Sequence, residues 1–181
     1  MSILAASLLN CSSSITDREI KQKIGSAPRR TDRLTLLSLL AAKPLKHLLH
    51  SSCGLYVASV NPDEKNMQEL LNAVCIQKLA PKPFQFVNSV SNAAGFYLAK
   101  ELQLEGPNLF LCSNDNIWNN LLMLAKLDLA CTVKQALLIN CINLAAPRIE
   151  VILLDAPLIV SGLTDFDRLC QQTPNFSSQS I

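Results

Sequence analysis

The chain has 181 residues, of which 49% are apolar and 17% charged, and its formal net charge at pH 7 is +2. This much apolar sequence can bury a real hydrophobic core, and the length favours one domain. A charge so close to neutral, without a run of Lys and Arg, argues against a nucleic-acid partner. No apolar run reaches the roughly 18 residues that a membrane-spanning helix requires, so we expect a soluble, cytoplasmic protein.

The first 60 residues alternate apolar runs with capped segments. Residues 2–9 (SILAASLL) predict a first strand, and residues 16–24 (TDREIKQKI) form a short polar segment with a good N-cap. Residues 30–42 (RTDRLTLLSLLAA) predict a helix whose apolar stripe packs on a sheet. Residues 54–60 (GLYVASV) indicate the next buried strand, and this alternation is typical of an α/β fold.

Residues 61–79 (NPDEKNMQELLNAVCIQKL) begin with turn and acidic capping residues and continue as an amphipathic helix. Its apolar stripe consists of Met67, Leu70, Leu71 and Val74. From the pattern alone, this stripe is interpreted as packing against the core of the same chain.

The stretch from Phe84 to Leu129 combines a helix, a turn, a strand and a second helix. Residues 91–104 predict a small-residue helix, which Gly106-Pro107-Asn108 ends. Residues 109–112 (LFLC) are a candidate buried strand, with Cys112 inside it as a small core side chain. Residues 113–127 (SNDNIWNNLLMLAKL) again start on capping residues and predict an amphipathic helix.

Two continuous apolar runs follow, at residues 134–143 (KQALLINCIN) and 149–155 (IEVILLD). Runs of this kind are typical of strands buried on both faces by helices. From Thr164 the sequence is polar and rich in Ser and Gln, and we expect it to fray beyond Pro174. The predicted organisation is therefore one domain over residues 1–163 and a polar tail over residues 164–181.

Seven cysteines are scattered without a CxxC motif or a metal-ligand spacing. This pattern indicates reduced, mostly buried thiols, and we expect neither a metal site nor a cofactor. The chain has two histidines, His47 and His50, which flank a Leu-rich stretch. We expect both to lie at the surface or at a helix end.

The order of small-residue helix, Gly-Pro turn, strand and capped helix resembles the segment around the active-site cysteine of β-ketoacyl synthases in the thiolase superfamily. The RxDR segment at Arg30, Asp32 and Arg33 resembles a second ketosynthase element, near the start of that fold. Together the two matches cover roughly residues 1–155. They imply the N-terminal half only of a thiolase-like (ketosynthase) fold, an α/β structure with a mixed sheet covered by helices.

The resemblance also locates the nucleophile. Counting from Gly106 through GPNLFLCSND places it at Asp115, and an error of one place would give Asn114 or Asn116. None of these is a thiol, no histidine follows residue 50, and NCINLAAP stands where ketosynthases have a Gly-Gly-x-Glu-type turn. Decarboxylative condensation needs a thiolate nucleophile served by histidines, so the resemblance implies a subunit without catalytic residues.

The implied function is that of a non-catalytic chain length factor. Such a subunit forms a heterodimer with an active β-ketoacyl-ACP synthase and shapes its acyl tunnel during polyketide or fatty-acid-like chain elongation, here most like the aryl polyene type. The acyl carrier protein would be reached through the partner. In the family, the two subunits pair through the strand before the nucleophile, here Leu109, Phe110, Leu111 and Cys112. The implied candidates for the acyl tunnel and its gating are Met67, Leu70, Leu71, Val74, Phe84, Phe86, Asn88 and Asn92.

Two other classes stay open at this point. One is a homodimeric ketosynthase-like scaffold or a docking module for an acyl carrier protein. The other is a small hydrolase or acyltransferase that uses Asp115 or a cysteine. A GxSxG motif and a histidine downstream of the nucleophile are both missing from the sequence, which argues against the second class.

Overall fold

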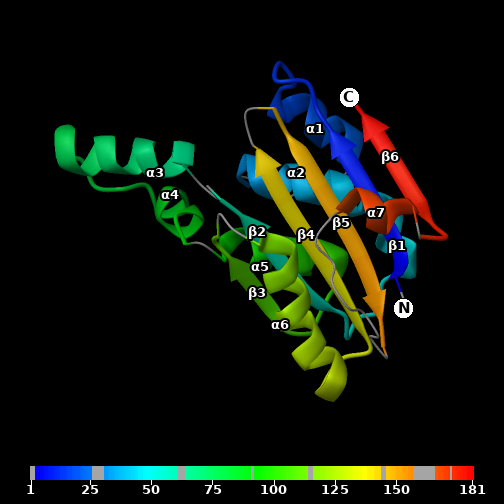
Figure 1. Cartoon of the computed structure of the whole chain (residues 1–181). Coiled ribbons are helices and arrows are strands. Elements are labelled where there is room, and N and C mark those ends of the chain that lie inside the picture. The colour runs from blue at the N-terminus through cyan, green and yellow to red at the C-terminus, as the bar shows by residue number, and fades with distance from the viewer. Residues whose placement is uncertain are drawn as a thin grey trace.

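The computed structural model describes residues 3–25, 31–60, 64–90, 92–113, 116–143, 146–156, 166–171 and 173–181. The strands of this part form one mixed sheet in the order β3-β2-β4-β5-β1-β6 (Figure 1). Their bounds are Ile3–Asn10 (β1), Gly54–Ser59 (β2), Asn108–Leu111 (β3), Gln135–Asn143 (β4), Arg148–Asp155 (β5) and Phe176–Ser180 (β6). β2 runs parallel to β3 and β4, whereas β5 is antiparallel to β4 and β1. The predicted mixed sheet is thus confirmed.

Helices cover both faces of the sheet, and each face has its own hydrophobic core. The helical segments are Asp17–Ile24 (α1), Arg33–Ala42 (α2), Lys43–Leu48 (η1, a 3-10 helix), Glu64–Leu71 (α3), Asn72–Ile76 (η2, a π-helix), Pro83–Asn88 (α4), Ala93–Leu102 (α5), Ile117–Cys131 (α6) and Phe166–Gln171 (α7). α2 and α5 pack on one face with α1 against α2, and α6 and α7 lie on the other (Figure 1).

The starts of α1 and α2 are held by the residues that the sequence pattern singles out. Thr16 and Glu19 form a reciprocal capping box, and the Asp32 carboxylate accepts a hydrogen bond from the Thr35 amide at 2.8 Å. Burial raises the pKa of Asp32, although the hydrogen bonds from Thr35 oppose this rise. Arg33 joins the two helices through an ion pair with Asp17 at 2.7 Å. Arg30 lies outside the described residues.

The C-terminal segment is more ordered than its composition predicts. β6 pairs in parallel with β1, and the Ile181 amide donates to the Asn10 carbonyl at 3.0 Å. The expectation that the chain frays beyond Pro174 is therefore wrong, because β1 offers an open edge whose backbone groups the polar segment can pair with. The predicted boundary between residues 163 and 164 falls outside the described residues.

A polar contact made by the Tyr56 hydroxyl links the sheet to α6. Tyr56 is fully buried on β2 and donates to the Asp128 carboxylate of α6 at 2.6 Å. Burial raises the pKa of Tyr56, and the hydrogen bond to Asp128 raises it further. The folded state therefore favours the neutral phenol.

We expect Tyr56→Phe to lower the free energy of unfolding at neutral pH by about 1 kcal/mol, because Asp128 loses its donor. Tyrosine in the unfolded chain releases its proton above about pH 10, while Tyr56 in the folded chain retains it. This stabilising contribution is thus complete below that pH and is lost above it. Urea unfolding from pH 7 to 11 should show a steeper alkaline loss for the wild type and for the control Tyr97→Phe than for Tyr56→Phe. Parallel curves would contradict the assignment.

Candidate partner interface

β3 forms one edge of the sheet and is pinned there by its preceding turn. The Glu105 amide donates to the Ser51 carbonyl at 2.7 Å, and the Leu55 amide donates to the Pro107 carbonyl at 2.7 Å. In the described structure its strand partner is β2. The backbone groups on the other side of β3 are therefore available to pair with another chain.

The side chains of β3 are less buried than the apolar run predicts. Leu109 is 42% exposed, while Phe110 and Leu111 are half-buried against the cores on opposite faces. Cys112 follows the last residue of β3 and is exposed, with its thiol donating to the Val60 carbonyl at 3.3 Å. The predictions of a buried strand and of a core role for Cys112 are both wrong, because β3 is an edge strand and Cys112 lies beyond it.

Residues 64–90, which we call the arm, extend away from the sheet as α3, η2 and α4 (Figure 1). The Asn66 side-chain amide donates to the Gln85 carbonyl at 2.9 Å and ties α3 to α4. None of residues 66–90 is buried. Core packing of the stripe on this helix is therefore the wrong interpretation, because α3 packs along α4 and not on the sheet.

The apolar side chains of the arm face solvent in the isolated chain. Leu71 is 53% and Phe86 62% exposed, and Leu70 is half-buried. The other exposed apolar side chains of the arm are Met67, Val74, Ile76, Leu79, Phe84, Val87 and Val90. Of the predicted polar candidates, Asn88 and Asn92 are half-buried, and Asn92 precedes α5 as its N-cap.

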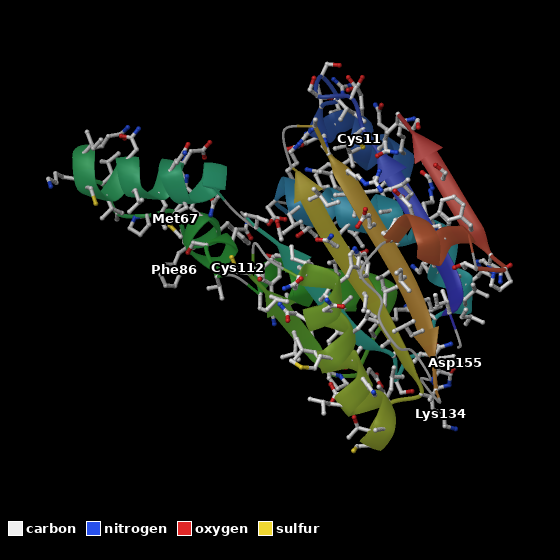
Figure 2. All side chains as sticks on the ribbon, viewed as in Figure 1. Cys11, Met67, Phe86, Cys112, Lys134 and Asp155 are labelled. Atoms are coloured by element: carbon white, nitrogen blue, oxygen red, sulfur yellow. The ribbon has the colours of Figure 1, made fainter. Side chains whose placement is uncertain are left out.

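The arm and β3 belong to the same side of the molecule. α4 leads into α5, which carries the exposed Phe96 and packs against β3. Figure 2 shows Cys112, at the end of β3, on the side of the sheet from which the arm with Met67 and Phe86 extends. A surface with this many apolar side chains is typical of a protein interface.

α6 begins close to the predicted nucleophile position. Asn114 and Asp115 lie outside the described residues, and Asn116 is the N-cap of α6 in a left-handed conformation with φ of 52°. Two residues further, the Trp118 indole donates to the buried Glu150 carboxylate at 2.8 Å. Sequence reasoning did not select Glu150, although an acid between Ile149 and Val151 in the apolar run IEVILLD was a visible signal.

The titratable side chains of the described residues do not form a further site. All seven cysteines are free, but only Cys53 and Cys141 are buried, so the expectation of mostly buried thiols is wrong. Burial raises the pKa of the Cys53 thiol to about 12. His47 and His50 are exposed, as expected. Among the described residues, no group of three or more His, Cys, Asp or Glu is placed to hold a metal ion. None of the helices in this part of the chain combines the length and the apolar character of a membrane span.

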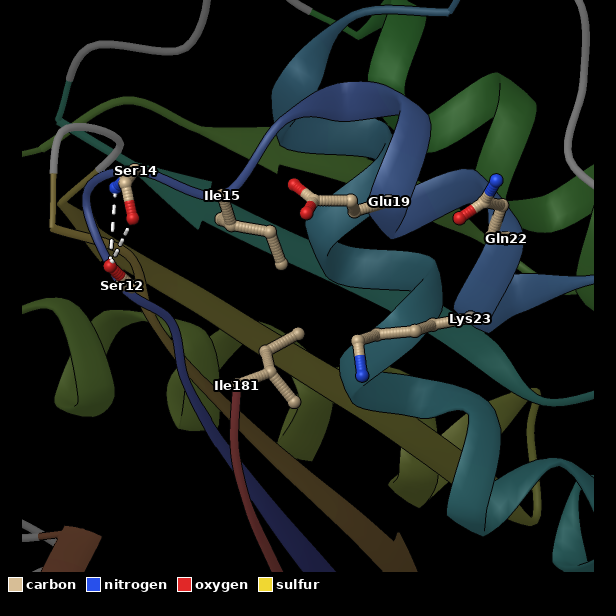
Figure 3. A pocket seen from close by; sticks show the side chains of 7 residues that line it. All are labelled: Ser12, Ser14, Ile15, Glu19, Gln22, Lys23 and Ile181. Atoms are coloured by element: carbon tan, nitrogen blue, oxygen red, sulfur yellow. Dashed lines mark hydrogen bonds between the residues drawn. The ribbon is translucent and has the colours of Figure 1, made fainter.

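A cavity of about 450 Å³ opens between α1, the loop before it and the C-terminal residue (Figure 3). It is lined by Ser12, Ser14, Ile15, Glu19, Gln22, Lys23 and Ile181. Ile181 directly follows β6, the strand at the edge of the sheet opposite β3. The cavity therefore takes no part in the candidate interface.

Comparison with known proteins identifies the fold. No protein-family model and no curated protein matches the chain. Among solved structures, it superposes with a TM-score of 0.65 and 15% identity on a chain of the ketosynthase ApeO in complex with its chain length factor ApeC from Xenorhabdus doucetiae, covering 89% of this chain and 82% of that one. Both chains are thus of similar length.

A chain of the ishigamide ketosynthase/chain length factor matches with a TM-score of 0.66 and 14% identity. The match covers 83% of this chain and 50% of that one, so the present chain spans about half the length of that relative. The predicted fold class, a partial thiolase-like ketosynthase fold, is confirmed by these two similarities. At such low identity they establish the fold alone.

Proposed function

We propose that this ketosynthase-like chain is a non-catalytic chain length factor that forms a heterodimer with an active β-ketoacyl-ACP synthase. Its role would be in polyketide or fatty-acid-like elongation, of the aryl polyene type. One observation carries the proposal: the half-fold has an open apolar edge at β3, flanked by an exposed apolar arm. A partner that covers both would bury this surface.

The residues that this chain contains indicate which of the two subunits carries the catalytic groups. An Asp at position 115 can be accommodated at the mouth of a helix by its dipole, but its acyl derivative would be a mixed anhydride. Such a derivative is unsuited to a stable acyl-enzyme intermediate. The partner therefore supplies the nucleophilic thiol and the histidines, and acyl carrier protein reaches the complex through the partner.

The pairing that we propose joins the two subunits through β3. The corresponding strand of the synthase would lie antiparallel to β3, so that the two sheets become one and the open backbone groups of β3 are satisfied. Leu109, Phe110, Leu111 and Cys112 would be its contact residues. The edge position of β3 and the exposure of Leu109 support this geometry.

The arm would then help to shape the far end of the partner's acyl tunnel. Its apolar side chains offer the surface that a hydrocarbon chain prefers, and they face away from the core of their own chain. The candidates remain Met67, Leu70, Leu71, Val74, Phe84, Phe86, Asn88 and Asn92.

The first experiment is co-expression with the ketosynthases of the same genome, purification through a tag on this chain, and native mass spectrometry. A one-to-one complex with a ketosynthase that has a Cys and two His in its active site is the expected result. A folded, monodisperse homodimer without such a partner would instead favour the scaffold alternative. Thioester hydrolysis by the isolated chain, lost in Asp115→Asn, would favour an enzyme.

Within the complex, Met67→Ala is expected to shift the products towards longer chains, because it shortens a side chain at the proposed tunnel end. Glu69→Ala on the same helix is the matched control, since Glu69 is exposed and polar. Mass spectrometry of the acyl products measures the shift. If Met67→Ala, Leu71→Ala and Phe86→Ala all left the distribution of product chain lengths unchanged, the arm would not contribute to the acyl tunnel.

A further inference from the structure

The face of the sheet that carries α6 is closed by a second, much shorter helix. α6 packs over β2 and β4, whereas α7 lies over β5 and β1 on the same face (Figure 1). Ala6, Ile152 and Leu154 point to this face and are fully buried. If no helix lay over it, the part of the face that these residues form would be a large exposed apolar surface.

An aromatic stack attaches α7 to the rest of the molecule. Phe166, the first residue of α7, is 3% exposed and stacks on Trp118 of α6 with ring centroids 5.6 Å apart and an interplanar angle of 21°. Trp118 is itself fixed, because its indole N–H donates to Glu150. The stack therefore places α7 against a rigid platform.

A polar relay forms the second attachment. Besides Trp118, Glu150 accepts from Asn140 Nδ2 at 3.2 Å and from Arg148 Nε at 2.9 Å. Arg148 also pairs with Asp167 of α7 through Nη2 at 3.1 Å. The buried carboxylate is thus compensated by three donors, and one of them extends the network to α7.

We propose that α7 is a cover helix, which closes the second face of the sheet within the same chain and keeps it from binding other apolar surfaces. Partner binding is thereby directed to the β3 edge and the arm. Two contacts hold α7 in place. One is the stack of Phe166 on Trp118, and the other is the ion pair between Arg148 and Asp167, which we call the clasp. This inference concerns a different surface from the proposed heterodimer interface and holds whichever protein binds there.

The single tryptophan of the chain, Trp118, makes the cover directly measurable. In the full-length chain, Phe166→Ala should shift the Trp118 emission to longer wavelength, increase its quenching by acrylamide, and cause concentration-dependent self-association through the uncovered face. Phe176→Ala is the matched control, because Phe176 is exposed and belongs to β6 of the same C-terminal segment. It should change none of these readouts.

Unchanged emission and quenching in folded Phe166→Ala would overturn the proposal. If that variant does not fold, Asp167→Lys replaces it, because the Asp167 side chain is 70% exposed and its reversal breaks the clasp without creating a cavity. The expected result is the same emission shift and increase in quenching, but smaller than in Phe166→Ala. Neither dilution nor partner binding should suppress these changes. Unchanged emission and quenching would again overturn the proposal. The readouts on the isolated chain do not depend on a ketosynthase, so failure here and failure of the heterodimer are distinguishable.

Discussion

Leu109→Arg is expected to abolish the complex with the ketosynthase while the chain itself stays folded. Leu109 is already 42% exposed in the isolated chain, so an arginine there remains solvated. In the proposed complex the same charge would be buried at the joint of two sheets without a partner. A cost of about 3 kcal/mol or more follows, which weakens binding by at least about 100-fold.

Leu127→Arg is the matched control for this variant. Leu127 is 64% exposed and belongs to α6 instead of β3, so the same substitution should leave binding unchanged. Binding would be measured by isothermal titration calorimetry and folding by circular dichroism. Wild-type affinity in a folded Leu109→Arg variant would remove β3 from the interface.

Thiol alkylation provides an independent readout on the same interface. Cys112, next to β3, and Cys131, at the end of α6, are both exposed in the free chain. Complex formation should protect Cys112 and leave Cys131 reactive. Leu109→Arg should abolish this protection, whereas Leu127→Arg should retain it.

Gly106→Ala is expected to have the largest effect on stability. A Cβ at this position would lie 2.5 Å from the Cys53 carbonyl oxygen and 2.8 Å from that of Ser52. Both obstacles are backbone atoms directly before β2, so they cannot move aside as a side chain can. We expect a loss of about 2 to 3 kcal/mol in the free energy of unfolding.

Gly25→Ala is the control for Gly106→Ala. It tests the effect of an unfavourable backbone conformation without a steric clash. Gly25 has a positive φ of 89°, and a Cβ added there would meet nothing within 4 Å, so alanine should cost about 1 to 2 kcal/mol from backbone strain alone. Urea unfolding would measure both variants. A Gly106→Ala loss no larger than that of Gly25→Ala would show that the turn before β3 can relax.

Local sequence patterns account well for the elements themselves. The runs at residues 134–143 and 149–155 are strands buried on both faces, and the predicted helices over residues 30–42 and 91–104 are present as α2 and α5. Helix caps can be predicted equally well, because the side chains of Thr16 and Asp32 accept hydrogen bonds from backbone amides three residues away. These features depend on neighbours in the chain, which the sequence displays directly.

The burial of each element cannot be predicted from the local sequence in the same way. The stripe of Met67 and Leu71 has the spacing of a core-facing helix, yet it lies exposed on the arm. Periodicity shows that a helix has an apolar side but not which surface covers that side. The polar tail, in turn, becomes β6 because β1 provides a strand edge that its own composition does not reveal.

By itself the sequence determined the alternation of strands and helices, the resemblance to ketosynthases, and the absence of a thiol at residues 114–116, where that resemblance implies the nucleophile. Only the tertiary structure decided that β3 is an edge strand, that the arm stands away from the core, and that Trp118, Glu150 and Arg148 meet beneath α7. The physical reason is the range of the interactions involved. Capping and periodicity act over one or two helical turns, whereas sheet order and buried networks join residues that lie tens of positions apart.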